Sequence, residues 1–296
     1  MPPLPRRELR NLVRKLDASA RPAQQRQALA SIAALSSGHR EDLASLAAIV
    51  AAGAIPPLVQ LLGRVDAPED VQRDALLALS YLAQNSENSI AIAASGAIPA
   101  LVQLLRSDVP APLKATVIAA LMILGSNAAN ASTVAAAIIP TLVQLLAPGS
   151  ENLVQELAAG ALLELATQAE NAAATAAAGA GPLLVAMLGP GCSSQQQRLA
   201  SSILMHLAEK AGSAGATATS AAIPPLVQLM GHGSPAEVQW CANRALRAMQ
   251  GSSAENRAVI DREMADAEVL QKMNGLGVGT PRRRVTCRRT TSPQVP

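Results

Sequence analysis

A ten-residue segment recurs at nearly constant spacing along this 296-residue chain. It is clearest as GAIPPLVQLL at 53–62 and GAIPALVQLL at 96–105. The first prolines of five successive copies are Pro56, Pro99, Pro140, Pro182 and Pro224, so the steps are 43, 41, 42 and 42 residues. A period of this length is typical of stacked repeats, in which each unit buries its apolar face only against the next one. The chain is therefore predicted to fold as an α-solenoid.

One period contains the signals for three helices. A short apolar stretch at 89–95 ends at Gly96, and glycine suits a left-handed helix C-cap. Pro99 then fits the first turn of a second helix, because proline there costs no intrahelical hydrogen bond. A breaker segment at 107–110 separates it from a longer third helix at 113–124. The other long helices are expected at 69–83, 152–166, 195–208 and 236–249.

This three-helix unit, with its recurring Gly-Ala-Ile-Pro junction, resembles the armadillo repeat over about residues 6–274. HEAT repeats are similar but typically have two helices per unit and lack this junction. The resemblance implies an all-α fold, a right-handed α-solenoid of about five full three-helix repeats with partial repeats at both ends. The expected units lie near 6–37, 41–84, 87–126, 127–167, 169–210 and 212–250, followed by a partial cap at 254–274 and a disordered basic tail at 275–296.

Two parts of the chain depart from the repeat pattern of the other units. The copies beginning at Ala137 and Ala221 lack the junction glycine, and Gly181 replaces the isoleucine, so we expect these junctions to be smoother or more mobile than the others. In the partial cap, 255–260 is expected to form a first helix and 267–273 a degraded second one.

The net charge of +3 is the sum of segregated charges. Residues 1–40 hold eight bases and two acids, residues 41–274 hold eleven bases and nineteen acids, and residues 275–296 hold five arginines and no acid. No Lys or Arg occurs between Lys114 and Arg198. The middle of the solenoid is therefore expected to be acidic and apolar, with basic ends.

Composition bounds the compartment and the chemistry. No uninterrupted apolar stretch of about 18 residues indicates a membrane span, and the Arg-rich start is not a signal peptide, although it leaves open an organellar transit peptide. Cys192, Cys241 and Cys287 share no metal or disulfide spacing, which favours a reducing compartment, cytoplasmic or nuclear. The glycines of 275–279 follow no strand and precede Pro281, so they form no phosphate loop. We expect no active site, no cofactor, no metal and no small-molecule substrate.

The resemblance also implies where partners bind. In armadillo proteins the third helices line a concave groove, and importin-α-like receptors place ladders of Trp and Asn there. The closest match is the segment 77–81, with Leu77 in the Trp place and Tyr81 in the Asn place, so neither ladder exists. The candidate partner-binding residues are Arg73, Leu77, Tyr81, Met122, Glu164, Arg198, Met205, His206, Trp240 and Arg244. Among these we favour Tyr81, His206 and Trp240, against the alternatives that Trp240 packs on its own unit and that His206 holds no ligand.

The tail carries two arginine clusters and possible phosphorylation sites. Its candidate signal residues are Arg282, Arg283, Arg284, Thr286, Arg288 and Arg289. Such clusters suit a nuclear import signal, an electrostatic contact with membrane or nucleic acid, or docking against the acidic middle, and an inert tail is equally compatible.

The sequence therefore favours a non-enzymatic, monomeric scaffold that binds protein or peptide partners in its groove. One alternative is an importin-α-like nuclear transport adaptor, which would need an Arg-rich arm before the repeats. Another is the substrate-recruiting armadillo protein of a ubiquitin ligase system. Direct nucleic-acid binding is disfavoured, because aromatic residues are nearly absent and the body is acidic.

Overall fold

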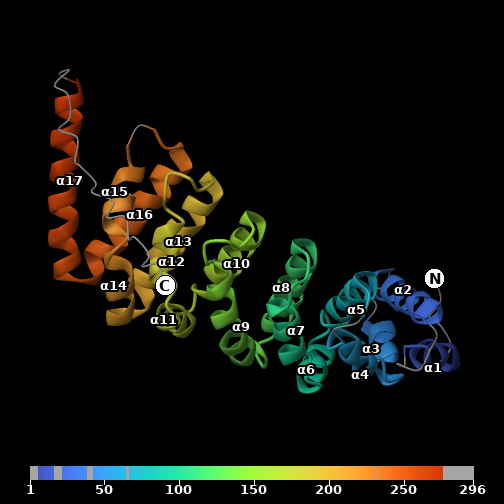
Figure 1. The fold of residues 1–296 in the computed structure, drawn as a ribbon. Helices are drawn as coiled ribbons and strands as arrows, with labels where there is room; N and C mark the ends of the chain where they lie inside the picture. Colours follow the sequence, from blue (N-terminus) through green and yellow to red (C-terminus); the bar gives the residue numbers. More distant parts are fainter. Residues whose placement is uncertain (1–5, 17–21, 39–42, 65–66, 232, 276–296) are drawn as a thin grey trace, which may run out of the picture.

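The computed structural model describes residues 6–16, 22–38, 43–64, 67–231 and 233–275. These residues form seventeen α-helices and no β-strand. The helices follow one another along an elongated stack, from α1 at one end to α17 at the other (Figure 1). The all-α solenoid predicted from the repeat period is confirmed.

The last helix of each unit belongs to a continuous row. Each member packs on the next: α2 on α5, α5 on α8, α8 on α10, α10 on α13 and α13 on α16. We call these six the third helices: α2 (Pro22–Gly38), α5 (Glu69–Leu82), α8 (Ala111–Gly125), α10 (Asn152–Leu165), α13 (Ser194–Lys210) and α16 (Ala236–Ser252). For the five helices from α5 to α16, the bounds agree with the predicted ranges to within a turn at either end.

The shorter helices complete the units. The second helices are α1 (Arg6–Arg14), α4 (Ile55–Leu62), α7 (Ala97–Arg106), α12 (Ala180–Ala186) and α15 (Ile223–Leu229). The first helices are α3 (Leu43–Ala51), α6 (Ser86–Ala94), α11 (Ala169–Ala177) and α14 (Gly212–Ser220). The fourth unit instead has one helix, α9 (Ala131–Leu145), before its third helix.

The residue at the junction between the first and second helices explains why the fourth unit has one helix there instead of two. Gly96 has a φ of 85°, the left-handed conformation that separates α6 from α7. Ala137 stands at the matching junction of the fourth unit, and the chain there stays helical through Pro140. The prediction of a smoother junction at Ala137 is confirmed, while the expectation of three separate helices in that unit is wrong. At Ala221 a break between α14 and α15 remains.

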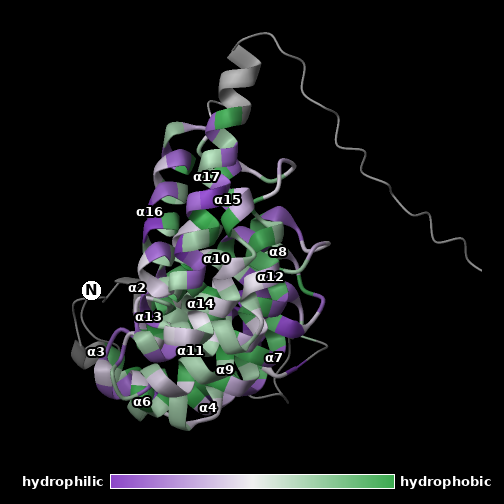
Figure 2. Ribbon diagram, turned by 90° about the vertical axis from the view of Figure 1, so that its left-hand side faces the viewer, coloured by the Kyte–Doolittle hydropathy of each residue, from purple (hydrophilic) through white to green (hydrophobic). Residues whose placement is uncertain are grey.

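The end of the solenoid also differs from the sequence-based expectation. Residues 254–275 form one continuous helix, α17, rather than two short ones. No glycine or proline occurs between 254 and 274, so nothing in the local sequence interrupts the helix. In Figure 2, which faces this end of the stack, hydrophilic residues are prominent on α16 and α17.

Glutamines near the start of the third helices anchor them to the preceding turns. In five units a glutamine Nε2 donates to a backbone carbonyl eight or nine residues earlier, just after the second helix. The pairs are Gln25 with Leu16 (3.0 Å), Gln72 with Arg64 (3.1 Å), Gln155 with Ala147 (2.9 Å), Gln197 with Gly189 (3.0 Å) and Gln239 with Gly231 (3.0 Å). These bonds occupy carbonyls left free at helix ends and hold the third helices in register.

Among the described residues, no single helix combines the length and apolarity needed to cross a membrane. Only the consecutive helices α6 and α7 reach that composition together, and they meet at a bend of 70°.

Candidate binding surface

The third helices share one accessible face. Residues four apart on a helix lie on the same side, and at each such position on this face the side chain is exposed or half-buried. We call this surface the third-helix face. It comprises Arg26, Ala30 and Ala34 on α2, Arg73, Leu77 and Tyr81 on α5, Ala115, Ala119 and Ile123 on α8, Glu156, Gly160 and Glu164 on α10, Arg198, Ser202 and His206 on α13, and Trp240, Arg244 and Ala248 on α16.

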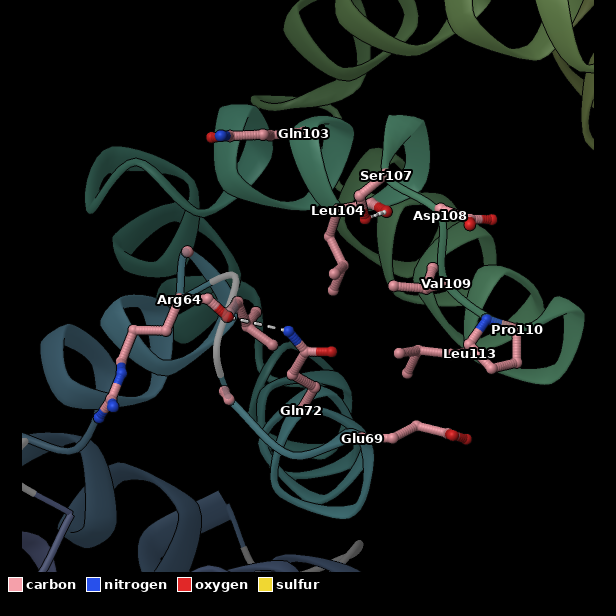
Figure 3. A pocket seen from close by; sticks show the side chains of 13 residues that line it. Arg64, Glu69, Gln72, Gln103, Leu104, Ser107, Asp108, Val109, Pro110 and Leu113 are labelled. Carbon is pink, nitrogen blue, oxygen red and sulfur yellow. Dashed lines mark hydrogen bonds between the residues drawn. The ribbon is translucent and has the colours of Figure 1, made fainter.

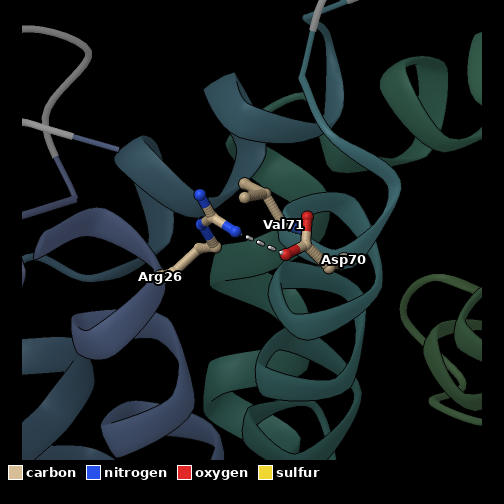
Figure 4. A network of polar contacts seen from close by, with 3 residues as sticks. All are labelled: Arg26, Asp70 and Val71. Atoms are coloured by element: carbon tan, nitrogen blue, oxygen red, sulfur yellow. Dashed lines mark hydrogen bonds and ion pairs between the residues drawn. The ribbon is translucent and has the colours of Figure 1, made fainter. Parts of the chain in front are cut away.

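The N-terminal end of this face carries arginines. Arg26 Nη1 lies 3.3 Å from Asp70 Oδ2, so this ion pair joins α2 to the start of α5 (Figure 4). Both side chains are about half exposed, and such pairs contribute little to stability, about 0–1 kcal/mol. Arg73 is exposed next to half-buried Leu77 and Tyr81. This end therefore combines positive charge with an apolar and aromatic surface.

The middle of the face is smooth and acidic. Its side chains on α8 are small or apolar, and Gly160 on α10 has open space where a Cβ would stand. Glu164 is exposed, and Glu156 accepts a 2.7 Å hydrogen bond from Ser193 Oγ. With no Lys or Arg between 114 and 198, the carboxylates here have no basic neighbours on their own units.

A cavity of about 720 Å³ opens beside this middle section. It lies between the C-terminal ends of α8 and α10 and the starts of α9 and α11, and its lining includes Met122, Glu164 and Glu170. The partial negative charge of the two helix C-termini is opposed by the partial positive charge of the two helix N-termini, so the carboxylates determine the sign of the charge here. Glu164 and Glu170 therefore make the cavity suited to a cation beside an apolar wall.

A second cavity, of about 370 Å³, lies away from the third-helix face. Figure 3 shows it between the loops that precede α5 and α8, with Leu104 and Leu113 pointing into it and Gln72 bonded to the Arg64 carbonyl. None of the residues predicted from sequence to bind partners lines it.

The C-terminal end of the face holds the sole tryptophan of the chain. Trp240 is 60% exposed, and the guanidinium carbon of Arg244 lies 4.7 Å from the centroid of its ring, in cation–π contact. On the adjacent helix, Arg198 donates a 2.8 Å hydrogen bond to the neutral side chain of Gln195. This end therefore combines an accessible aromatic ring with guanidinium groups.

His206 lies beside this cluster. Its Nδ1 is buried, has no hydrogen-bond partner and lies 3.9 Å from Glu209 Oε2. Burial lowers the pKa of His206 below its usual 6.5; Glu209 opposes this shift, whereas Lys210 and Arg244 reinforce it. Burial therefore favours the neutral form of His206.

The structure distributes the predicted binding residues as follows. Arg73, Glu164, Trp240 and Arg244 are exposed, and Leu77, Tyr81, Met122, Arg198 and His206 are half-buried. Met205 is 5% exposed and lies in the core, so it is removed from the candidates. Trp240 is 60% exposed and contacts Arg244 of its own helix, so the alternative that it packs on its own unit stays open. The tail candidates Arg282, Arg283, Arg284, Thr286, Arg288 and Arg289 lie outside the described residues.

Two features of the surface were not predicted from the sequence. One is the contact of Trp240 with Arg244, although the spacing of four residues on a helix was a sufficient signal. The other is the row of small residues in the middle of the face, with Ala119 on α8 and Gly160 on α10. In the described part of the chain, no group of three His, Cys, Asp or Glu side chains is arranged to hold a metal ion.

The comparisons with known proteins agree with the repeat geometry. A family model for the armadillo/β-catenin-like repeat matches residues 46–84. A designed armadillo repeat protein in complex with the peptide (KR)4 is 28% identical, with a TM-score of 0.66 over 82% of this chain and 99% of that one. A computationally designed armadillo repeat protein for modular peptide recognition is 27% identical, with a TM-score of 0.66 over 81% and 99% of the two chains.

An engineered protein is 30% identical, with a TM-score of 0.69, over 90% of this chain and 63% of its own length. No curated protein matches the chain. The repeat period, the three-helix units and these similarities together identify the chain as an armadillo repeat protein.

Proposed function

We propose that the chain is a non-enzymatic scaffold that binds extended segments of partner proteins along the third-helix face. The observation that carries this proposal is the unbroken row of accessible side chains across six consecutive third helices. The similar designed proteins support it, since one is in complex with a peptide and another was made for peptide recognition.

The dimensions of the face suit an extended chain. Packed helices lie about 8–10 Å apart, and an extended peptide advances about 3.3 Å per residue. Each third helix therefore meets about three residues, and the whole face spans a segment on the order of 14 residues. An extended segment contacts every unit in turn, whereas a globular partner of similar width touches only part of the row.

The chemistry of the face favours recognition through side chains. Where importin-α-like receptors have Trp and Asn, this face has small residues such as Ala119 and Gly160, and charged or polar side chains at other positions, such as Glu164 and Arg244. Charged side chains therefore take the place of the Asn amides that bind the peptide backbone in those receptors. For this reason we propose a scaffold rather than a nuclear import adaptor. The acidic middle section suits basic or apolar partner residues, in keeping with the (KR)4 peptide bound by the designed protein. The spacing of the cysteines supports a cytoplasmic or nuclear location.

The test is site-specific crosslinking of peptides selected from a random library against the full chain. A photo-crosslinking p-benzoylphenylalanine replaces Ala119 on the third-helix face in one variant and Ile90, which is 45% exposed on α6, in the matched control. Selected peptides are expected to crosslink at position 119 and not at position 90. Crosslinking at position 90 alone, or equally at both, would contradict the proposal.

A further inference from the structure

The C-terminal end of the third-helix face carries unneutralised positive charge. Within the described residues, no ion pair joins Arg198, Arg244 or Arg247 to a carboxylate. The nearby acids are Glu209, which lies next to His206, and Glu237 in the first turn of α16. Arg244 and Arg247 are exposed, and Arg198 donates from Nε and Nη2 to the neutral side chain of Gln195, so the three guanidinium groups keep their positive charge without a paired carboxylate.

Trp240 holds one of these groups in a defined place. With Arg244 lying over the indole ring, the flat face of the guanidinium is covered, while its edge carries the N–H donors. A carboxylate binds such an edge through two parallel hydrogen bonds. Because the stacked side chain has already lost much of its freedom, less entropy is lost when an anion binds.

We infer that the cluster of Arg198, Trp240 and Arg244 binds a carboxylate-rich segment of the partner. This inference rests on the proposed function and names the chemistry of one end of its ligand. Arg244 binds a carboxylate along its edge, Arg198 supplies a second cation from α13, and Trp240 offers its exposed ring to the aliphatic part of the bound side chains. Burial of an aromatic ring beside an arginine is typical of the residues that dominate interface energies.

The position of this cluster adds a spacing rule for the partner. The acidic middle lies on α10, and the cluster lies on α13 and α16, one to two helix steps further on. At about 8–10 Å per step, this separation corresponds to about three to six residues of extended chain. The partner segment therefore carries its basic or apolar residues and its acidic residues about that far apart.

The probe is the acidic peptide (DE)4, with the nearly isosteric neutral peptide (NQ)4 as its control. Both are labelled with fluorescein and titrated into the full chain, and binding is followed by anisotropy. Trp240 is the only tryptophan in the chain, so its own emission reports independently on binding at this site. We expect (DE)4 to raise the anisotropy and change the Trp240 emission with the same midpoint, and (NQ)4 to do neither.

The variants Arg244→Gln and Arg262→Gln remove the same charge from different places. Arg262 is 69% exposed on α17, away from the third-helix face, and serves as the matched control. We expect Arg244→Gln to weaken (DE)4 binding about tenfold, as for loss of a charge-assisted pair, and Arg262→Gln to change it less than about twofold. A full-length variant with all five tail arginines changed to glutamine is expected to keep the Trp240 response.

Two results would overturn the inference. One is equal weakening by Arg244→Gln and Arg262→Gln, and the other is (DE)4 binding that leaves the Trp240 emission unchanged; either means that net charge alone attracts the peptide. In both cases the proposed function stands if library peptides still crosslink at position 119. If no peptide crosslinks there, the proposed function and this inference both fail.

Discussion

The middle of the third-helix face and its C-terminal end use the same backbone for opposite surfaces. On α8 and α10 the accessible positions hold alanine, isoleucine, glycine and glutamate, whereas on α13 and α16 the equivalent positions hold arginine, serine, histidine, tryptophan and alanine. Both sections keep the helix row intact, because the buried leucines and alanines that stack the units do not reach this face. The residues that stack the units are therefore separate from those that set the charge and polarity of the face.

Two glycines of the solenoid differ in the space around them. A Cβ added to Gly215 on α14 would lie 1.9 Å from the carbonyl oxygen of Leu207 on α13, whereas one added to Gly160 on α10 would meet nothing within 4 Å. Gly215 thus lies at a close contact between two helices, and Gly160 lies on the open third-helix face. Four predictions use these differences, beginning with the largest effect.

Gly215→Ala is expected to destabilise the fold by about 3 kcal/mol, since the methyl group has to displace backbone in a packed interface. Urea unfolding measures this change. The matched control is Gly251→Ala on α16, where a Cβ meets no atom within 4 Å. If the two variants unfold at the same urea concentration, the close approach of α13 and α14 is not a feature of the folded chain.

Glu164→Lys is expected to weaken binding of (KR)4 about fivefold, because it reverses charge at an exposed position beside the acidic cavity. Binding of (DE)4 at the other end should change less than about twofold, since charges further apart than the Debye length of about 8 Å are screened. Titrations in buffer of physiological ionic strength distinguish the two ends. Equal changes for both peptides would show that the face acts as one uniform charged surface.

His206→Gln is expected to flatten the pH dependence of the melting temperature. The pKa of His206 is lowered in the folded state, so the unfolded chain binds its proton more readily and folded stability is lost as the pH falls below 6.5. The groups facing His206 are Glu209 and Lys210 on its own helix and Arg244 on α16. Melting curves between pH 8 and pH 5 compare the variant with the parent. Parallel curves for the two proteins would mean that burial of His206 does not affect stability.

Gly160→Ala is expected to stabilise the middle section slightly, by about 0.5–1 kcal/mol, because glycine inside a helix costs that much relative to alanine. The substitution leaves the acidic side chains in place, so (KR)4 affinity should stay within about twofold. A loss of stability in urea unfolding would indicate that α10 has no room at this position.

Much of the fold follows from the repeat period and from the prolines and glycines that mark where helices begin and end. The proline, glycine and leucine positions predicted the third helices and the left-handed residue at Gly96. They did not predict the continuous helices α9 and α17, because the absence of a breaker is a weaker signal than its presence and neighbouring units decide whether the chain bends. The glutamine anchors also escaped notice, since their carbonyl partners lie eight or nine residues away across a turn.

The binding surface was predicted less completely. Helical spacing placed Trp240 and Glu164 on the accessible face, because exposure along a helix follows its period. Met205 was wrongly placed on the accessible face. It is next to accessible His206 in the sequence, but adjacent residues on a helix point in different directions, and the Met205 side chain lies in the core. Contacts between units, such as the approach of Gly215 to Leu207, depend on how the helices dock and have no local sequence signal.

Hydrogen exchange of the full chain with each peptide reports which helices a ligand protects, and so distinguishes the two ends of the third-helix face. We expect (DE)4 to slow exchange mainly in α13 and α16, and (KR)4 to do so mainly in α8 and α10. Protection of the same segments by both peptides, or protection confined to the first and second helices, would contradict a third-helix face with separate ligand preferences along its length.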